Sequence, residues 1–215
     1  MKKSVYILII GFALFFLASP GFSQEATQAK DIRFTVKTNP ISALGGPLWA
    51  SIVPLTAEYK VYFEIKTSSK QSIQLGLGYL GTSPIIKNAA DIGGDTSIVS
   101  SGFHGQLWYK FFLTSDKAPG GFYIGPHISY AFAKTKNNLV ETNYMNATKL
   151  NVHCVFGYQV ITKGGFALDI YTGIGLKRKT YDFPNQTLNN VFSDLEIKDK
   201  TTVSVPLGVT FGYAF

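Results

Sequence analysis

The last fifteen residues, TTVSVPLGVTFGYAF (residues 201–215), alternate strictly between two kinds of side chain. One parity is small or polar, and the other is bulky and apolar: Val203, Val205, Leu207, Val209, Phe211, Tyr213 and Phe215. A period of two is typical of a β-strand, whose successive side chains point to opposite faces. The apolar parity runs on to the terminal Phe215, so we expect a strand whose apolar face is buried by something outside it.

The first residues, MKKSVYILIIGFALFFLASPGFSQ, begin with two lysines, continue with an apolar run at residues 5–18 and end with small residues. This order is typical of a secretory signal peptide. We therefore expect a signal peptide at residues 1–23 and one mature domain at residues 24–215. An uncleaved anchor is the alternative, although the run is shorter than the ~20 residues that span a bilayer. The expected cleavage site has no cysteine, so a lipid-anchored lipoprotein is not supported.

The composition fits strands that face something drier than water. Charged residues make up 15% of the chain and aromatic residues 14%, whereas about a quarter of a soluble domain is charged. Cys154 is the one cysteine, which excludes an internal disulfide. The net charge of +7 falls to +5 without Lys2 and Lys3, and the basic residues form no basic aromatic stripe. We therefore expect no nucleic-acid partner.

Seven further segments show the same period of two. They are DIRFTVKTNP (31–40), VPLTAEYKVYFEI (53–65), SIQLGLGYL (72–80), GFHGQLWYKFFL (102–113), GFYIGPHISYAFA (121–133), LNVHCVFGYQV (150–160) and GFALDIYTGIGLK (165–177). With the C-terminal run they predict an all-β fold, a closed antiparallel transmembrane β-barrel of eight strands. Each run is long enough to cross a bilayer, which takes about 9–11 tilted residues. Ten strands remain an alternative if the last long connection forms a hairpin inside the sheet.

Short and long connections alternate along the chain, as they do in outer-membrane barrels. The short ones are KTSSKQ, TSDKAPG and TKGG, and the long ones are expected at residues 81–100, 134–149 and 180–200. The first outer connection, around GGPLW (45–49), departs from this pattern because it is short.

Parity alone does not say which face of the strands is inside, because a soluble lipocalin-like barrel also alternates. The face with small or polar side chains is rich in glycine and in ionisable groups. The apolar face carries aromatic residues near the strand ends. Inside a narrow eight-strand barrel, glycine makes room for long side chains to cross the interior. Aromatic residues at both ends of an apolar face are typical of membrane girdles. We therefore expect the apolar face to point to lipid.

Three segments resemble a known class of protein. Phe215, preceded by Tyr213 and Phe211, resembles the C-terminal signal read by the barrel-assembly machinery of Gram-negative outer membranes. VKTNPISALGGPLWASIVPLTAEYKVYFE (36–64) and GGFYIGPHISYAF (120–132) resemble the first hairpin and the central strand of small outer-membrane β-barrel proteins of the Bacteroidetes type, one family of which is described only as of unknown function.

This resemblance implies an integral protein of the cell outer membrane of a Gram-negative bacterium, broadly like OmpA and OmpX. Its partners would be outer-membrane lipid and lipopolysaccharide, and the barrel-assembly machinery during biogenesis. We expect a monomer with a structural or surface-interaction role through its outer loops, and no enzymatic activity.

The inward ionisable residues are the first candidate site. We expect a lumen polar network of Arg33, Glu58, Lys60, Glu64, Lys110 and Asp169. Its role would be structural, since the interior of an eight-strand barrel is about filled by side chains and buried polar groups must be satisfied. A narrow pore is the alternative.

A catalytic alternative rests on HISYAFAKTKNNLVE, in which His127 and Ser129 precede Asn137 and Glu141. Such a set supplies a base, a nucleophile, an oxyanion donor and an orienting acid. It resembles the H-x-S pattern of lipid A deacylases, which are also outer-membrane barrels. The inward parity of His127 and Ser129 favours instead a pair of polar lumen residues.

The remaining candidates are simpler. His104, His127 and His153 share the inward parity on separate strands, and we interpret them as hydrogen-bonding lumen residues rather than metal ligands. No metal or cofactor is expected. Lys177, Arg178 and Lys179 lie where the seventh strand is expected to leave the membrane, and lysine and arginine suit contact with lipopolysaccharide phosphates. Cys154 is interpreted as a small outward hydrophobe.

Overall fold

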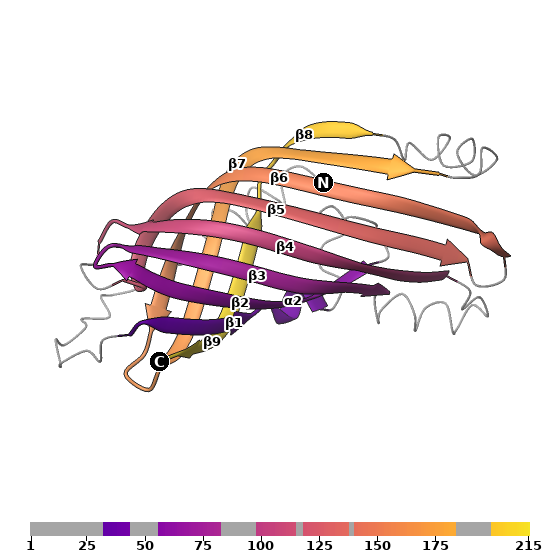
Figure 1. The fold of residues 1–215 in the computed structure, drawn as a ribbon. Coiled ribbons are helices and arrows are strands. Elements are labelled where there is room, and N and C mark those ends of the chain that lie inside the picture. Colours follow the sequence, from indigo (N-terminus) through magenta and orange to yellow (C-terminus); the bar gives the residue numbers. More distant parts are fainter. Residues whose placement is uncertain (1–31, 44–55, 83–97, 115–117, 138–139, 184–198) are drawn as a thin grey trace, which may run out of the picture. The chain divides into compact units, whose positions relative to one another are not determined.

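A computed structural model of the chain describes residues 32–43, 56–82, 98–114, 118–137, 140–183 and 199–215. In these residues the fold is nearly all β (Figure 1). The strands are β1 (Phe34–Thr38), β2 (Thr56–Ser68), β3 (Gln71–Thr82), β4 (Ile98–Phe112), β5 (Gly121–Asn137), β6 (Val140–Ile161), β7 (Phe166–Asp182), β8 (Lys200–Ser204) and β9 (Leu207–Ala214). The four-residue helix α2 (Pro40–Ala43) follows β1.

The strands form a closed antiparallel barrel. Each strand from β1 to β7 pairs with its neighbour in the sequence, and β9 pairs with both β7 and β1. Closure therefore joins the first strand to the last, through Thr35–Thr38 of β1 and Phe211–Ala214 of β9. The prediction of an all-β closed antiparallel barrel with eight strands around it is confirmed.

The eighth strand is interrupted, which the sequence pattern did not predict. β8 pairs with residues 175–179 of β7, and β9 pairs with residues 166–172 of the same strand. Val205 and Pro206 lie between them and make no ladder pair with β7. Proline has no N–H to donate, although the Pro206 carbonyl still accepts a hydrogen bond from Thr172 Oγ1 at 2.9 Å. The expected continuous strand at residues 201–215 is therefore two segments.

A second correction concerns the expected outer connection at residues 134–149. β5 continues to Asn137 and β6 begins at Val140, and the two strands stay paired through this region. The prediction failed because the outward side chains there, such as Lys134, Lys136 and Asn146, are polar, so the outward apolar alternation that marks the other strands is missing. The long connections around β3–β4 and β7–β8 lie at residues 83–97 and 184–198, outside the described residues.

We use two names for the ends of the barrel. The turn end carries the short turns at Ser69–Lys70 and residues 162–165, together with the terminal Phe215. The loop end is the opposite end, toward which β1, β3, β5 and β7 run. The expected signal peptide and the GGPLW connection lie outside the described residues.

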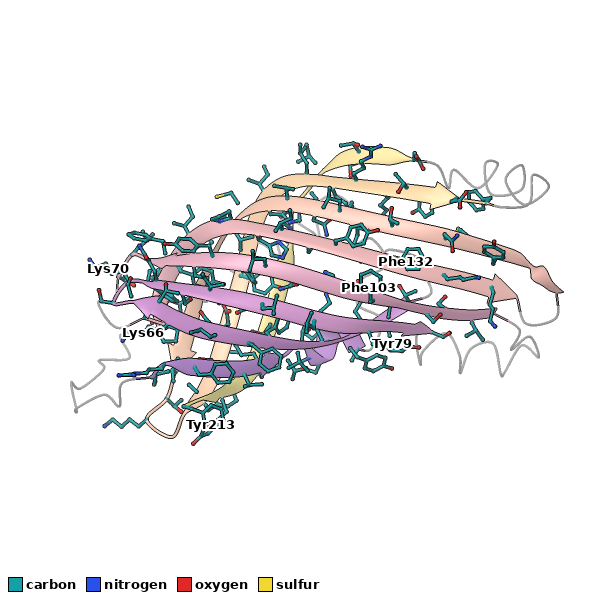
Figure 2. The ribbon with its side chains drawn as sticks, in the orientation of Figure 1. Lys66, Lys70, Tyr79, Phe103, Phe132 and Tyr213 are labelled. Atoms are coloured by element: carbon teal, nitrogen blue, oxygen red, sulfur yellow. The ribbon has the colours of Figure 1, made fainter. Side chains whose placement is uncertain are left out.

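The polarity of the barrel wall is the reverse of that of a soluble protein. The outward parity is apolar and exposed along every long strand, whereas lysines, carboxylates and histidines of the inward parity are buried. Figure 2 shows Tyr79, Phe103 and Phe132 in a row across β3, β4 and β5, with Tyr213 near the opposite end of the barrel. Within the described part of the chain, no helix is long and apolar enough to cross a membrane.

Candidate functional site

The barrel interior contains a closed group of charges near its turn end, which we call the charge network. The ammonium of Lys37 contacts Glu64 Oε2 at 2.6 Å and Asp169 Oδ2 at 3.0 Å. The ammonium of Lys110 contacts Asp169 Oδ2 at 2.6 Å and Glu64 Oε1 at 3.5 Å. All of these side chains are fully buried. Two cations and two anions therefore neutralise each other without contact with solvent.

Neutral side chains complete the hydrogen bonding of this charge network. Gln159 Oε1 accepts from both ammonium groups, at 2.8 Å from Lys37 and 2.9 Å from Lys110. The hydroxyl of Tyr123 donates to Asp169 Oδ1 at 2.7 Å, and the hydroxyl of Ser72 donates to Glu64 Oε1 at 2.5 Å. Buried ionic groups stabilise a fold only when their remaining bonds are satisfied in this way.

The charge network takes one side chain from each of the first seven strands. Its members, in the order β1 to β7, are Lys37, Glu64, Ser72, Lys110, Tyr123, Gln159 and Asp169. It therefore cross-links the wall from the inside, including the pair β1–β7 that flanks the closing strand β9. An ion pair between these two strands holds the barrel closed independently of the β1–β9 ladder.

Protein atoms cover the charge network on both sides. On the turn side, the Pro119 carbonyl accepts from Gln159 Nε2 at 2.7 Å, and Ala118 is buried beside Phe112. On the loop side, the Trp108 ring packs edge-on against the rings of Tyr171 and Tyr123, with ring centroids 4.6 and 6.1 Å apart, respectively. The turn half of the interior is thus filled by side chains.

Inward glycines make room for the rings on the loop side. A Cβ atom on Gly157 would lie 2.5 Å from the Tyr123 hydroxyl oxygen, and one on Gly208 would lie 2.3 Å from that of Tyr171. We expected inward glycines to make room for long side chains that cross the interior. At these two positions it is aromatic side chains that use the space.

The loop half of the interior contains a cavity of about 500 Å³. Its polar lining comes from five strands: Glu58, Lys60, His104, Gln106, His127, Ser129, Lys149, Asn151, His153 and Lys177. Tyr171 separates it from the charge network, and residues of α2 and 203–209 of the interrupted strand form its other side. We call it the loop-side cavity.

One carboxylate serves several cations in the loop-side cavity. Glu58 contacts the ammonium of Lys60 directly, and its Oε1 lies 3.4 Å from Lys149 Nζ. Its Oε2 lies 3.6 Å from His104 Nδ1. Lys177 lines the same cavity.

The predicted catalytic set is not assembled among the described side chains. Ser129 accepts a hydrogen bond from Asn151 Nδ2 at 2.8 Å. His127 instead stacks on His153, with their Nδ1 atoms 3.4 Å apart, and its ring is tilted by 54° to that of Trp108 at a centroid distance of 4.9 Å. The side chains of Asn137 and Glu141 lie outside the described ones. His127 and Ser129 thus lie in the lumen wall, as their parity predicted.

The six predicted network residues divide into three groups. Glu64, Lys110 and Asp169 lie in the charge network, whereas Glu58 and Lys60 lie in the loop-side cavity beyond Tyr171. Arg33 precedes β1 and is exposed, so its predicted place in the network is wrong. The reason is its position: it lies beside the terminal Phe215, at the rim of the turn end, where its backbone N–H donates to the Phe215 carbonyl at 3.0 Å.

The predicted lipopolysaccharide-contact residues also separate. Arg178 is exposed on the outward parity, but Lys177 lines the loop-side cavity and the half-buried Lys179 shares its parity. Consecutive residues of a strand point to opposite faces, so this triplet does not form one outer patch. Phe211, Tyr213 and Phe215, the predicted assembly signal, lie on the outer face at the turn end, and the backbone N–H of Phe215 donates to the Phe34 carbonyl at 2.8 Å.

Several functional residues were missed. Lys37 shares the inward parity but was not assigned to the network, and Gln159, Tyr123 and Ser72 were not considered as its partners. Their parity was the available signal. What the sequence did not reveal is the register that brings residues from distant strands to one level. Among the described residues no three His, Cys, Asp or Glu side chains group as metal ligands. Cys154 is exposed on the outer face.

Comparison of the chain with protein-family models, with curated proteins and with solved structures finds no match.

Proposed function

We propose that this chain is an integral β-barrel protein of the outer membrane of a Gram-negative bacterium, of the small OmpA- and OmpX-like type found in Bacteroidetes. Its role is structural or interactive at the cell surface, with binding through the loop end. The observation that carries the proposal is the inverted polarity of the wall. Leu77, Ile174 and Leu176 are 54%, 59% and 56% exposed, while Lys37, Lys110 and Asp169 inside are almost completely buried.

Two aromatic bands on the outer face support the membrane placement. One contains Tyr79, Phe103 and Phe132 on neighbouring strands, and the other lies toward the turn end around Phe111 and Tyr213. Phe103 and Phe111 of β4 are eight positions apart, which is about 26 Å along a strand. Strands in barrels tilt by about 40°, so this is ~20 Å along the axis. That height is comparable to the apolar band of outer-membrane barrels, ~25 Å.

The filled turn half supports a structural role over a pore. The charge network and the rings above it occupy the cross-section that an ion would have to pass. Ser129 has no catalytic role in this proposal, because its hydroxyl accepts a hydrogen bond from Asn151 and not from a histidine.

The experiment that tests this function is fractionation followed by gel mobility. Envelopes from cells expressing the full chain are separated into inner and outer membranes, and the protein is run in detergent both unheated and boiled. We expect it in the outer membrane, with a folded band that shifts on boiling. A protein released as a soluble species with no shift would overturn the proposal and point to a soluble ligand-binding barrel.

A further inference from the structure

Two strands of the outer face end their apolar stretch with a basic residue. On β5 the outward side chains of residues 122–132 are apolar, and Lys134 is the next outward residue. On β7 the outward side chains of residues 166–176 are apolar apart from Thr172, and Arg178 is the next outward residue. Both basic side chains are exposed. Each strand thus changes from an apolar surface to a positive charge after the same length.

That length matches the apolar band of a membrane barrel. Both stretches extend over ten positions, which is about 33 Å along a strand. For strands that tilt by about 40° this is ~25 Å along the barrel axis, the height of the apolar band in outer-membrane barrels. In the proposed membrane placement, Lys134 and Arg178 therefore lie just beyond the loop-end border of the band, at the level of the lipid head groups.

The strand register brings the two basic residues to a similar height. Lys134 pairs with Asn146 of β6, and Arg178 pairs with Leu150 of the same strand. These levels are about 13 Å apart along β6, and β5 and β7 are about 10 Å apart across it. Strands that tilt by about 45° need an offset of about 10 Å over that separation to stay at one height. The observed offset exceeds this by about one residue length.

The turn end of the apolar band shows the same offset. Phe122 of β5 pairs with Tyr158 of β6, which pairs with Ile170 of β7. The outward aromatic residue of β7 at the turn end is Phe166, four positions below Ile170. The slant of the band between β5 and β7 is therefore a property of the wall and not of the two basic residues alone.

The basic groups on the two strands point to separate places. The ammonium of Lys134 lies over the Tyr144 ring, 4.0 Å from its centroid, a contact that favours a cation at this position. Tyr144 is six positions along β6 from Leu150, the partner of Arg178, which is about 20 Å. Lys136, the next outward residue of β5, is also exposed and lies still farther from Arg178. One phosphate therefore cannot contact the basic groups of both strands.

Phosphate is the anion that suits both places. Lysine binds it as a compact point charge, and arginine binds it through a planar fork of N–H donors. On β7 the outward acidic residue Asp182 lies four positions beyond Arg178, away from the apolar band. A head group that carries two phosphates, with acyl chains against the apolar stretches below, has the chemistry to contact both strands at once.

We propose that the outer face of β5–β7, at the loop-end border, binds a lipid whose head group carries two phosphates. One phosphate contacts Lys134 and Lys136, and the other contacts Arg178. The inference rests on the proposed function, because only a barrel in a bilayer presents this border to lipid head groups. Of the three basic residues that the sequence predicted as lipopolysaccharide contacts, it keeps only Arg178 and adds two from β5.

The test is native mass spectrometry of the full chain, purified in an uncharged detergent and mixed with diphosphoryl or monophosphoryl lipid A of the same acyl composition. These two lipids differ by one phosphate. The wild-type protein should retain the diphosphoryl lipid at least about fivefold more strongly, which is the factor expected of one further basic contact at an anionic surface. Arg178→Gln, and the double variant Lys134→Gln/Lys136→Gln, should each bring the ratio close to one.

Matched controls remove the same number of charges at the opposite end of the barrel. Lys163→Gln is the control for Arg178→Gln, and Lys70→Gln/Lys163→Gln is the control for the double variant, because both lysines lie in exposed turns at the turn end. The controls should keep the preference of the wild-type protein. A control that lowers the ratio as far as the border variants would overturn the assignment, since charge anywhere on the barrel would then suffice.

A phospholipid separates the two sources of phosphate. Phosphatidylglycerol carries one phosphate and acyl chains, and it should be retained no better than monophosphoryl lipid A. If phosphatidylglycerol is retained as well as the diphosphoryl lipid, the head group with two phosphates is overturned.

The outcomes distinguish this inference from the proposed function. A heat-shifting outer-membrane protein that retains the diphosphoryl and monophosphoryl lipids equally, or whose preference survives in the border variants, overturns the inference alone. A protein without the heat shift overturns both. The unheated gel band verifies that each variant is folded, and if one border variant does not fold, the other decides the result.

Discussion

Asp169 accepts hydrogen bonds from three side chains on three strands: Lys37, Lys110 and Tyr123. Its carboxylate therefore links β7 to three other strands, whereas a backbone ladder links only two neighbouring strands. Taking one charge out of such a buried group leaves the others without compensation, which costs more than the group contributed when intact.

We predict that Asp169→Asn strongly destabilises the barrel. The substitution keeps the shape but leaves two buried ammonium groups with one carboxylate, for which about 3–5 kcal/mol is expected. The measurement is urea unfolding in lipid vesicles, followed by the loss of the fast unheated gel band. Asp182→Asn, at the exposed end of the same strand, is the matched control and should stay within about 0.5 kcal/mol. Equal stability of the two variants would show that the charge network does not hold the wall.

Replacement by alanine is predicted to destabilise the barrel at one glycine of the wall, Gly125, and not at another, Gly105. A Cβ atom on Gly125 would lie 1.8 Å from the Tyr109 carbonyl oxygen, and this backbone atom has no rotamer with which to move away. A Cβ atom on Gly105 would meet nothing within 4 Å. Gly125→Ala should therefore cost at least about 1–3 kcal/mol, and Gly105→Ala should be neutral or stabilise by up to about 1 kcal/mol. The same urea titration compares them, and a Gly125→Ala barrel as stable as wild type would contradict the clash.

At this scale the sequence predicted the face of a residue better than its partner. Alternation placed Glu64, Lys110 and Asp169 inside correctly. It did not reveal that Lys37 and Asp169, 132 positions apart, would meet, because that distance depends on the stagger of strands accumulated around the closed barrel. Arg33 was misplaced because parity continues beyond the strand, whereas burial does not.

Strand β1, which closes the barrel by pairing with β9, has only five residues. Four residues, Thr35 to Thr38, pair with β9. The terminal Phe215 adds to this ladder from outside β9, since its N–H donates to Phe34 and its carbonyl accepts from Arg33. The end of the chain is therefore part of the seam and not an appendage to it.

Deletion of Phe215 is predicted to weaken the seam. Three backbone hydrogen bonds are lost, one donated by the Phe215 N–H to Phe34 and two accepted by its carbonyl from Arg33 and Phe34. At about 0.5–1.5 kcal/mol each, a loss of about 1.5–4.5 kcal/mol is expected. Phe215→Leu keeps all three backbone bonds and should lose less than the deletion. Refolding into detergent micelles measures stability without assembly machinery, and the amount in cells measures recognition as well. If the deletion and Phe215→Leu unfold at the same urea concentration, the seam does not depend on these bonds.

The elements that prediction missed have separate physical causes. In the extended β5–β6 hairpin the outward side chains are polar toward the loop end, as at Lys134 and Asn146, so outward apolar alternation carried no signal there. Helix α2 is a single turn, begun by the Asn39 side chain, which accepts from the Ser42 N–H at 3.1 Å, with Pro40 in the first position. Both residues favour helix starts, but four residues give no helical period. Pro206 was the visible signal for the interrupted strand, because proline weakens any strand interior.

For the molecule as a whole, the interior is divided by function. The turn half is filled by the charge network and the Trp108–Tyr171 contact, whereas the loop half contains the cavity and a buried apolar cluster of Leu80, Ala131, Ala133, Met145 and Ala147. Eight-strand barrels have room for side chains or one small ligand, and in this chain side chains fill the turn half.

We predict that a barrel filled in this way does not conduct ions. Wild-type protein in planar bilayers should give no discrete conductance steps, because Trp108, Tyr123 and Lys110 are buried in the barrel interior beside Asp169 and obstruct it there. A protein of the same preparation boiled before reconstitution is the baseline for leakage. Regular steps that appear with folded protein and not with boiled protein would contradict the filled interior and revive the pore.

The one-residue-per-strand arrangement of the charge network has a consequence for how this protein can change over generations. The ammonium of Lys37 is neutralised by carboxylates 27 and 132 residues further along the chain, and Lys110 of β4 is neutralised by Asp169 of β7, which belongs to a different hairpin. A hairpin exchanged with one from a related barrel would bring its own imbalance into a place that water does not reach. The residues at the rims of such a barrel can vary freely. A change of charge in the charge network, however, needs a compensating change at a second position far away in the sequence.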